Sequence, residues 1–223
     1  MPRTQNRPIP SGRISPATGL AIAIAYAVLG TVVLVLTAPL ITVVLSYVTL
    51  FFYNLVYTPL KKVTAFAVIP GSFVGALPPM IGWAGAGGSL TSEVILLVSV
   101  FFFIGQIPHF WLLLLMFGDQ YKLAGLPSLN QIFSEVQIKR ITYTWILTTL
   151  ASAMLVIFFV FSNQLLIFLL LFYTFYLLSS LSMAVFVQKE FKVRPAFYKL
   201  NLLYLFMMIF LVTDGLLRGQ AAF

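Results

Sequence analysis

The chain has 223 residues, of which 61% are hydrophobic and 8% charged, with one His and no Cys. A soluble domain of this length needs far more charge to cover its surface, so the composition predicts an integral membrane protein. The single His and the lack of Cys remove most zinc, heme-ligand and thiol-nucleophile options. The formal net charge of +8 is spread in small groups between apolar runs, which argues against a nucleic-acid partner.

About seven apolar stretches are long enough to cross a hydrocarbon core of about 30 Å as helices. Their residues are uniformly apolar, whereas the strands of a barrel would alternate at every second residue. We therefore predict an all-α fold, a polytopic transmembrane bundle of about seven helices. The expected spans cover residues 18–36, 40–57, 63–86, 94–117, 141–161, 165–187 and 197–217.

The connections between the expected spans alternate between basic and nearly neutral. Four basic segments hold all but one of the 13 Lys and Arg residues, and the exception is Arg218 near the C-terminus. Positively charged loops stay in the cytoplasm, so we expect a cytoplasmic N-terminus and a C-terminus on the far side of the cell inner membrane. Residues 1–17 are polar and lack the apolar core of a signal peptide, and we expect them to form a cytoplasmic segment.

Two Arg residues near the N-terminus, Arg3 and Arg7, lie beside Thr4. Guanidinium groups match phosphate oxygens, so this pair could hold an anionic group such as a diphosphate. A basic anchor at the head of a membrane helix is the alternative explanation.

The end of the second span carries Tyr53, Tyr57 and Lys61 at a spacing of four, followed by Lys62. This spacing puts them on one helical face if the turn continues past Pro59. Such a face could offer phenol and ammonium donors to a phosphate. An interfacial aromatic belt with basic anchors would have the same composition.

The expected third span, residues 63–86, is rich in Gly and Pro and should be irregular. Small residues at helix contacts would explain this composition. A broken helix that lines a cavity would explain it as well.

Polar residues near the fourth span are further candidates. Asp119, just beyond its end, could ligate Mg²⁺, which takes carboxylates together with substrate phosphates, although a solvated loop acid is the alternative. Within the span, Gln106 and His109 flank Pro108, and polar groups inside a span are candidate functional residues. His109 could instead bond a carbonyl freed by the proline. Near the C-terminus, Asp214 is expected to pair with Arg218 at the membrane interface.

Five blocks of the chain, in this order, resemble the heme O synthase family within the UbiA-type intramembrane prenyltransferases. They read MPRTQNRP at residues 1–8, YTPLKK at 57–62, GALPPMIGW at 75–83, PHFW at 108–111 and YKLAGLP at 121–127.

The resemblance implies a nine-helix bundle around a lipid-open cavity, with its active site at the cytoplasmic face. Residues 1–223 would then be one prenyltransferase domain that lacks the first helix pair and the acidic half of the first motif. Residues 1–17 would be its cytoplasmic motif segment. Gln120 stands where the family usually has an Asp, and Ala67 where it commonly has an Asn.

The resemblance also implies transfer of a farnesyl group from farnesyl diphosphate to a vinyl group of heme b, which gives heme O, with Mg²⁺ as cofactor. Heme A synthase and terminal-oxidase assembly proteins are candidate partners, besides the lipid bilayer. The alternatives are an enzyme of the same type that acts on a quinone precursor, and a non-catalytic membrane subunit. The implied site comprises Arg3, Arg7 and Lys62 for the diphosphate, Tyr57, Lys61 and Asp119 for catalysis, Asp119 for the metal, and His109 for the heme.

Overall fold

The computed structural model describes residues 4–127, 129–187 and 191–221, and every regular element in these ranges is a helix. Seven helical stretches within them are long and apolar enough to cross a membrane. The prediction of an all-α bundle with about seven spans is therefore confirmed. The spans are Pro16–Thr37, Leu40–Leu60, Ala65–Gly85, Glu93–Met116, Glu135–Val160, Gln164–Phe186 and Val193–Gly219.

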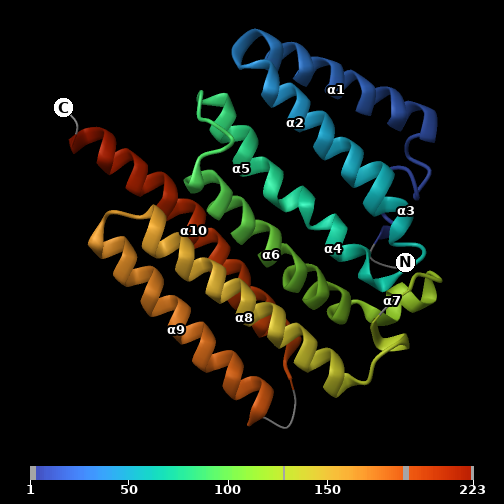
Figure 1. Cartoon of the computed structure of the whole chain (residues 1–223). Helices are drawn as coiled ribbons and strands as arrows, with labels where there is room; N and C mark the ends of the chain where they lie inside the picture. Colours follow the sequence, from blue (N-terminus) through green and yellow to red (C-terminus); the bar gives the residue numbers. More distant parts are fainter. Residues whose placement is uncertain (1–3, 128, 188–190, 222–223) are drawn as a thin grey trace.

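The first helices form a row in which each packs on the next (Figure 1). α1 (Pro16–Thr37) lies beside α2 (Leu40–Phe51), α2 lies beside α5 (Phe73–Gly85), and α5 packs on α6. α1 buries none of its residues. Its hydroxyl contact to α2, from Thr31 Oγ1 to Tyr47 Oη, measures 2.9 Å. α1 therefore exposes its apolar side chains, as a helix in contact with lipid does.

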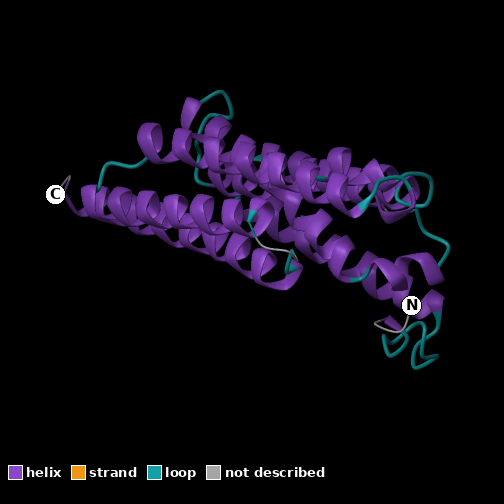
Figure 2. Ribbon diagram, turned by 90° about the horizontal axis from the view of Figure 1, so that it is seen from below, coloured by secondary structure: helices purple, strands orange, loops and turns teal. Residues whose placement is uncertain are grey.

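α6 (Glu93–Met116) is the central helix, since it packs against α5, α8 (Glu135–Val160) and α10 (Val193–Ala221). α9 (Gln164–Phe186) packs on both α8 and α10. The largest buried core lies between these helices and includes the fully buried Phe101. Figure 2 shows the helices in two layers, with the two termini at opposite ends of the molecule.

Two helices begin four or more residues before the apolar stretches that predicted them. α8 begins at Glu135 rather than at residue 141, because Ser134 and Gln137 form a capping box at its N-terminus. α10 begins at Val193 rather than at residue 197. Hydropathy detects only the apolar part of a span, so the polar first turns of both helices escape it.

The second span changes its helical winding before it ends. α2 stops at Phe51 and continues as a π-helix, Phe52–Tyr57, which passes into the short helix α3, Thr58–Leu60. The wider winding lets the Thr58 hydroxyl donate to the Tyr53 carbonyl at 2.8 Å. Short π-helical turns occur frequently at functional sites.

The third span is irregular, as predicted. It starts as a 3₁₀ turn and the one-turn helix α4, Val68–Gly71, and is interrupted at Ser72 before α5 begins. Pro78 and Pro79 lie inside α5, where they remove backbone hydrogen-bond donors. The third span is therefore an interrupted helix along the wall of the cavity described below.

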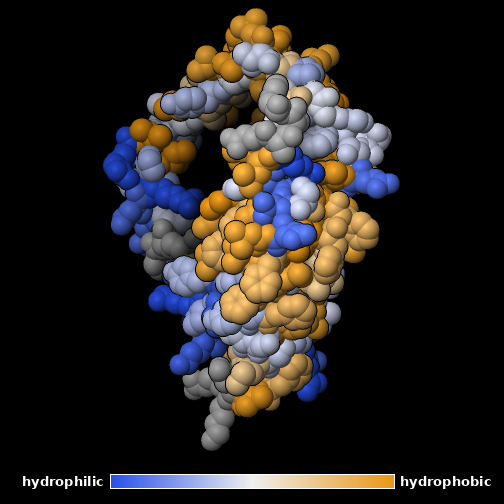
Figure 3. Space-filling view, turned by 90° about the vertical axis from the view of Figure 1, so that its left-hand side faces the viewer, coloured by the Kyte–Doolittle hydropathy of each residue, from blue (hydrophilic) through white to orange (hydrophobic). Residues whose placement is uncertain are grey.

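The N-terminal segment, α3, α7 (Gly118–Leu123) and the starts of α8 and α10 lie at one end of the bundle (Figure 1). The basic segments of the sequence thus gather at one end, which we call the basic end. Hydrophobic side chains cover much of the face in Figure 3, and hydrophilic ones lie mainly along its left side, with a further group near its centre. Such a surface suits a multi-pass membrane protein, since lipid solvates apolar side chains and the polar ends reach water.

Candidate functional site

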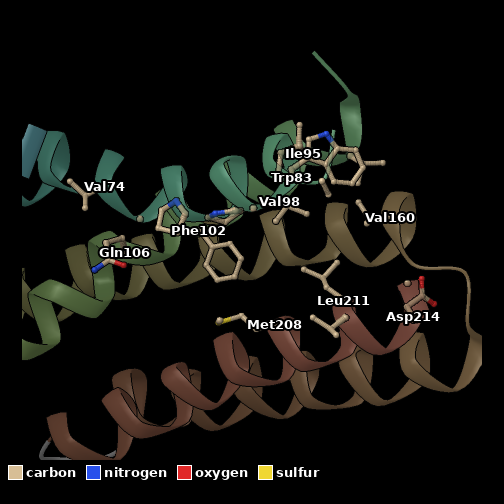
Figure 4. A pocket seen from close by; sticks show the side chains of 18 of the residues that line it. Val74, Trp83, Ile95, Val98, Phe102, Gln106, Val160, Met208, Leu211 and Asp214 are labelled. Carbon is tan, nitrogen blue, oxygen red and sulfur yellow. The ribbon is translucent and has the colours of Figure 1, made fainter. Parts of the chain in front are cut away.

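A cavity of about 950 Å³ lies between α5, α6 and α10. Its middle is apolar, and Phe102, Val98, Met208 and Leu211 lie there in Figure 4. Both ends carry polar side chains. Tyr53, Tyr57 and Gln106 line it toward the basic end, whereas Trp83, Asp214 and Arg218 line it at the opposite end. This division suits a ligand with a long apolar part.

α6 shapes the cavity through two rows of side chains spaced four apart. One row, Phe102, Gln106 and Phe110, lines the cavity. The neighbouring row packs on α10, where the Tyr204 hydroxyl donates to the Gly105 carbonyl at 2.6 Å. His109 belongs to this second row, so it lies at the seam between α6 and α10 beside the cavity wall.

Two glycines of the third span make room for side chains of this wall. A Cβ at Gly71 would lie 2.5 Å from Tyr57 Cδ2, and a Cβ at Gly75 would lie 3.1 Å from Gln106 Oε1. Both glycines also line the cavity. Both explanations for the Gly-rich span therefore apply, because its small residues permit close contacts and the interrupted span lines a cavity.

The predicted aromatic and basic face of the second span is confirmed. The rings of Tyr53 and Tyr57 are 5.7 Å apart, and Lys61 Nζ lies 5.6 Å from the centre of the Tyr57 ring. Tyr57 also stacks on Phe110 of α6 at 5.8 Å. Tyr57 therefore joins the second span to α6 at the basic end of the cavity.

The other predicted site residues of the basic end are less closely tied to the cavity. Arg3 lies outside the described residues. Arg7, Lys62 and Asp119 are exposed, and within the described part of the chain their side chains form no hydrogen bond or ion pair. Asp119 lies in the first turn of α7, on the same short helix as Tyr121.

A metal ion would have to find most of its ligands beyond the described residues of this chain. Among the described residues, no group of three His, Asp or Glu side chains is placed to hold one. Mg²⁺ needs only one or two carboxylates when substrate phosphates and water supply the remaining oxygens. Asp119 fits such a site as a single carboxylate ligand, because it is exposed at the basic end, on the same short helix as Tyr121 and Lys122.

His109 bonds a side chain of another helix and not a carbonyl freed by Pro108. Its Nδ1 lies 2.8 Å from Asn201 Oδ1 on α10, and the Asn201 amide nitrogen donates to the Phe197 carbonyl at 2.7 Å. Sequence reasoning missed Asn201. The sequence did contain a signal for it. A polar amide side chain inside an apolar span is energetically costly unless it has a hydrogen-bond partner, so Asn201 could have been predicted to have one.

The predicted ion pair between Asp214 and Arg218 is confirmed. The Asp214 carboxylate, 2% exposed, also accepts from the backbone N–H groups of Ser162 and Asn163, the latter at 2.8 Å. It therefore ties α10 to the turn between α8 and α9. This contact lies at the end of the cavity opposite the basic end.

Comparisons with known proteins agree on one family. The profile of the UbiA prenyltransferase family matches residues 1–210. Among curated proteins, the chain is 42% identical to a protoheme IX farnesyltransferase of Oleidesulfovibrio alaskensis over 127 residues, which covers 57% of this chain and 45% of that protein. It is 41% identical to one of Azorhizobium caulinodans over 154 residues, which covers 68% of this chain and 50% of that protein. The chain thus spans about half the length of the curated relatives it matches. No solved structure matches it.

Proposed function

The chain belongs to the UbiA prenyltransferase family, and on that premise we propose that it transfers a farnesyl group from farnesyl diphosphate to a vinyl group of heme b, which gives heme O. The observation that carries the proposal is the cavity, whose apolar middle and polar basic end suit an isoprenoid diphosphate. The names of the relatives, protoheme IX farnesyltransferase, support heme b as the acceptor.

The apolar part of the cavity would hold the farnesyl chain, because burying its methyl and methylene groups is favourable. The diphosphate would lie at the basic end, where Lys61 and the Tyr57 phenol are close together. Lys62, Arg7 and Arg3 would add charge from the neighbouring segments. Cationic donors form short, strong hydrogen bonds to phosphate oxygens, and guanidinium groups can bind them through two such bonds.

The reaction begins when the bond between the farnesyl carbon and the diphosphate oxygen breaks and its electron pair leaves with the diphosphate. Lys61 stabilises the charge that develops on this leaving group. The aromatic faces of Tyr57 and Phe110 stabilise the allylic cation. The apolar cavity keeps water away from it, which prevents premature hydrolysis.

The vinyl group of the heme then supplies the electron pair for the new carbon–carbon bond. A water molecule adds to the resulting cation and loses a proton, which leaves the hydroxyl group of heme O. Mg²⁺, held by Asp119 and the diphosphate, would supply further positive charge to the leaving group. His109 would contact the heme at the α6–α10 seam.

The remaining assignments rest on the same premise. Residues 1–223 form one prenyltransferase domain in the inner membrane, and residues 1–17 are its motif segment at the cytoplasmic side. Heme A synthase and terminal-oxidase assembly proteins are the candidate partners. The grouping of basic segments at one end of the bundle supports this orientation, since cytoplasmic loops carry an excess of Lys and Arg.

The test is heme O formation by membranes that contain the protein, supplied with heme b, farnesyl diphosphate and Mg²⁺. The wild-type protein should give heme O, detected by mass spectrometry. Lys61→Ala should slow the reaction by about 10- to 100-fold, since one charge that stabilises the leaving group is lost.

Lys192→Ala removes the same charge from an exposed loop at the same end and should leave the rate unchanged. Correctly inserted wild-type protein that forms no heme O would contradict the proposal. Prenylation of a phenolic quinone precursor in its place would establish the other acceptor.

A further inference from the structure

The environment of His109 defines which of its ring nitrogens carries hydrogen. Asn201 donates its amide nitrogen to the Phe197 carbonyl, so its amide oxygen is the atom that faces His109 Nδ1. If the Asn201 amide were rotated by about 180°, its oxygen would face the Phe197 carbonyl oxygen, with no hydrogen between the two acceptors. An amide oxygen can only accept, and His109 Nδ1 is therefore the donor. In the neutral ring, Nε2 keeps its lone pair.

The Nε2 atom of His109 is open. It forms no hydrogen bond to a described residue, and the buried side-chain atoms of these residues that lack a partner are only Ser99 Oγ, Trp111 Nε1 and Thr142 Oγ1. Nε2 is therefore not fully buried, and its lone pair has no hydrogen-bond partner among the described residues. The ring itself is held in place by the Phe197 ring at 5.0 Å and the Phe110 ring at 5.6 Å.

An imidazole that donates Nδ1–H to an oxygen and leaves Nε2 free is the arrangement of a metal-bound histidine. Heme iron in particular is often held by such a histidine. His109 is the single His of a chain without Cys, so the sequence contains no second imidazole and no thiolate for this purpose. His109 lies between Gln106 and Phe110 along α6, and both of these residues line the cavity.

We propose that His109 Nε2 binds the iron of the acceptor heme as an axial ligand, and that Asn201 is a positioning residue that fixes the tautomer and the ring orientation. The proposal rests on the proposed function, because it takes heme b as the substrate. It goes beyond that function in stating how the heme is held: its iron is bound at the contact between α6 and α10, beside the cavity. The heme is thereby fixed relative to the farnesyl cation that its vinyl group must capture.

The experiment titrates ferric heme b into the purified wild-type protein in lipid nanodiscs, followed by absorption and electron paramagnetic resonance spectroscopy. The wild-type protein should show an imidazole-ligated iron. His109→Gly should lose this signature and bind heme at least 10-fold more weakly. Added free imidazole should restore the spectrum, which would also show that the variant is folded.

Asn201→Leu should keep the ligand but weaken heme binding about 10-fold, within the range for lost outer-shell partners of metal ligands. It should also lower the iron–histidine stretching frequency of the ferrous complex in the resonance Raman spectrum, because the imidazole loses its acceptor and becomes less basic. The matched control is Asn54→Ala. Asn54 is another amide within a span, but it donates to the Leu50 carbonyl of its own helix, and its replacement should change neither property.

The outcomes separate the two claims. If the wild-type protein forms heme O and His109→Gly binds heme with an unchanged spectrum, the iron-ligand proposal is overturned while the enzymatic function stands. If Asn201→Leu leaves both the affinity and the stretching frequency unchanged, its positioning role is overturned. A wild-type protein that binds no heme b would contradict the proposed function together with this inference.

Discussion

The close contact of Gly71 with Tyr57 makes Gly71→Ala an informative variant. The new Cβ would lie 2.5 Å from Tyr57 Cδ2 and 3.1 Å from Cγ and Cε2 of the same ring. Carbon atoms in ordinary contact are about 3.5–4.0 Å apart, so the ring has to move by about 1 Å.

The displacement has consequences for both stability and rate. The stack of Tyr57 on Phe110 is worth about 0.5–1.5 kcal/mol. The contact of Lys61 with the Tyr57 ring is worth about 0.5–1 kcal/mol. We therefore expect the free energy of unfolding to fall by about 1–2.5 kcal/mol if both contacts are lost. A misplacement of about 1 Å at a reacting centre can cost about 100-fold in rate, so heme O formation should fall by about 10- to 100-fold.

The assay combines the rate of heme O formation with thermal unfolding in detergent. Gly30→Ala is the matched control, since its Cβ meets nothing within 4 Å and α1 lies away from the cavity. In a Tyr57→Ala background, Gly71→Ala should add almost no further loss, because the clashing ring is gone. An undiminished rate in the single variant, or a full additional loss in the Tyr57→Ala background, would refute the reasoning.

Three further outcomes are expected. Gly75→Ala should reduce the rate less than Gly71→Ala does, since its Cβ would lie 3.1 Å from the flexible end of Gln106; an equal or larger loss would contradict this. Asp214→Ala should lower the free energy of unfolding by about 1.5–3 kcal/mol, because hydrogen bonds to the carboxylate are lost. An unchanged melting temperature would contradict the role of Asp214 in joining α10 to the α8–α9 turn. Chelation of Mg²⁺ should stop heme O formation, and added Mg²⁺ should restore it. The Asp119→Asn variant should need a higher Mg²⁺ concentration to reach half of its maximal rate. A rate that does not depend on Mg²⁺ would rule out the metal.

Much of the membrane architecture could be predicted from the sequence, because it depends on local properties. A run of apolar residues identifies a span wherever it packs. The spacing of Tyr53, Tyr57 and Lys61 placed them on one face, since residues four apart are neighbours on any helix. The same rule predicted the pair of Asp214 and Arg218.

Some helix boundaries are marked in the sequence by polar residues, which a search for apolar stretches does not detect. The start of α8 is marked by the capping box of Ser134 and Gln137, two polar residues that an apolar window ignores. The π-helical turn at Phe52–Tyr57 is harder to predict, since its single extra residue per turn has no distinct residue pattern.

The tertiary structure alone decided which residues form the site. His109 and Asn201 are 92 positions apart, and only the packing of α10 on α6 brings Nδ1 to the amide oxygen. Only the packing of the third span against its neighbours shows that the Tyr57 ring lies close against Gly71 and that the Gln106 side chain lies close against Gly75. Composition and spacing determine what one helix does in a bilayer. The contacts between helices depend on how side chains far apart in the chain fit together, which no local pattern records.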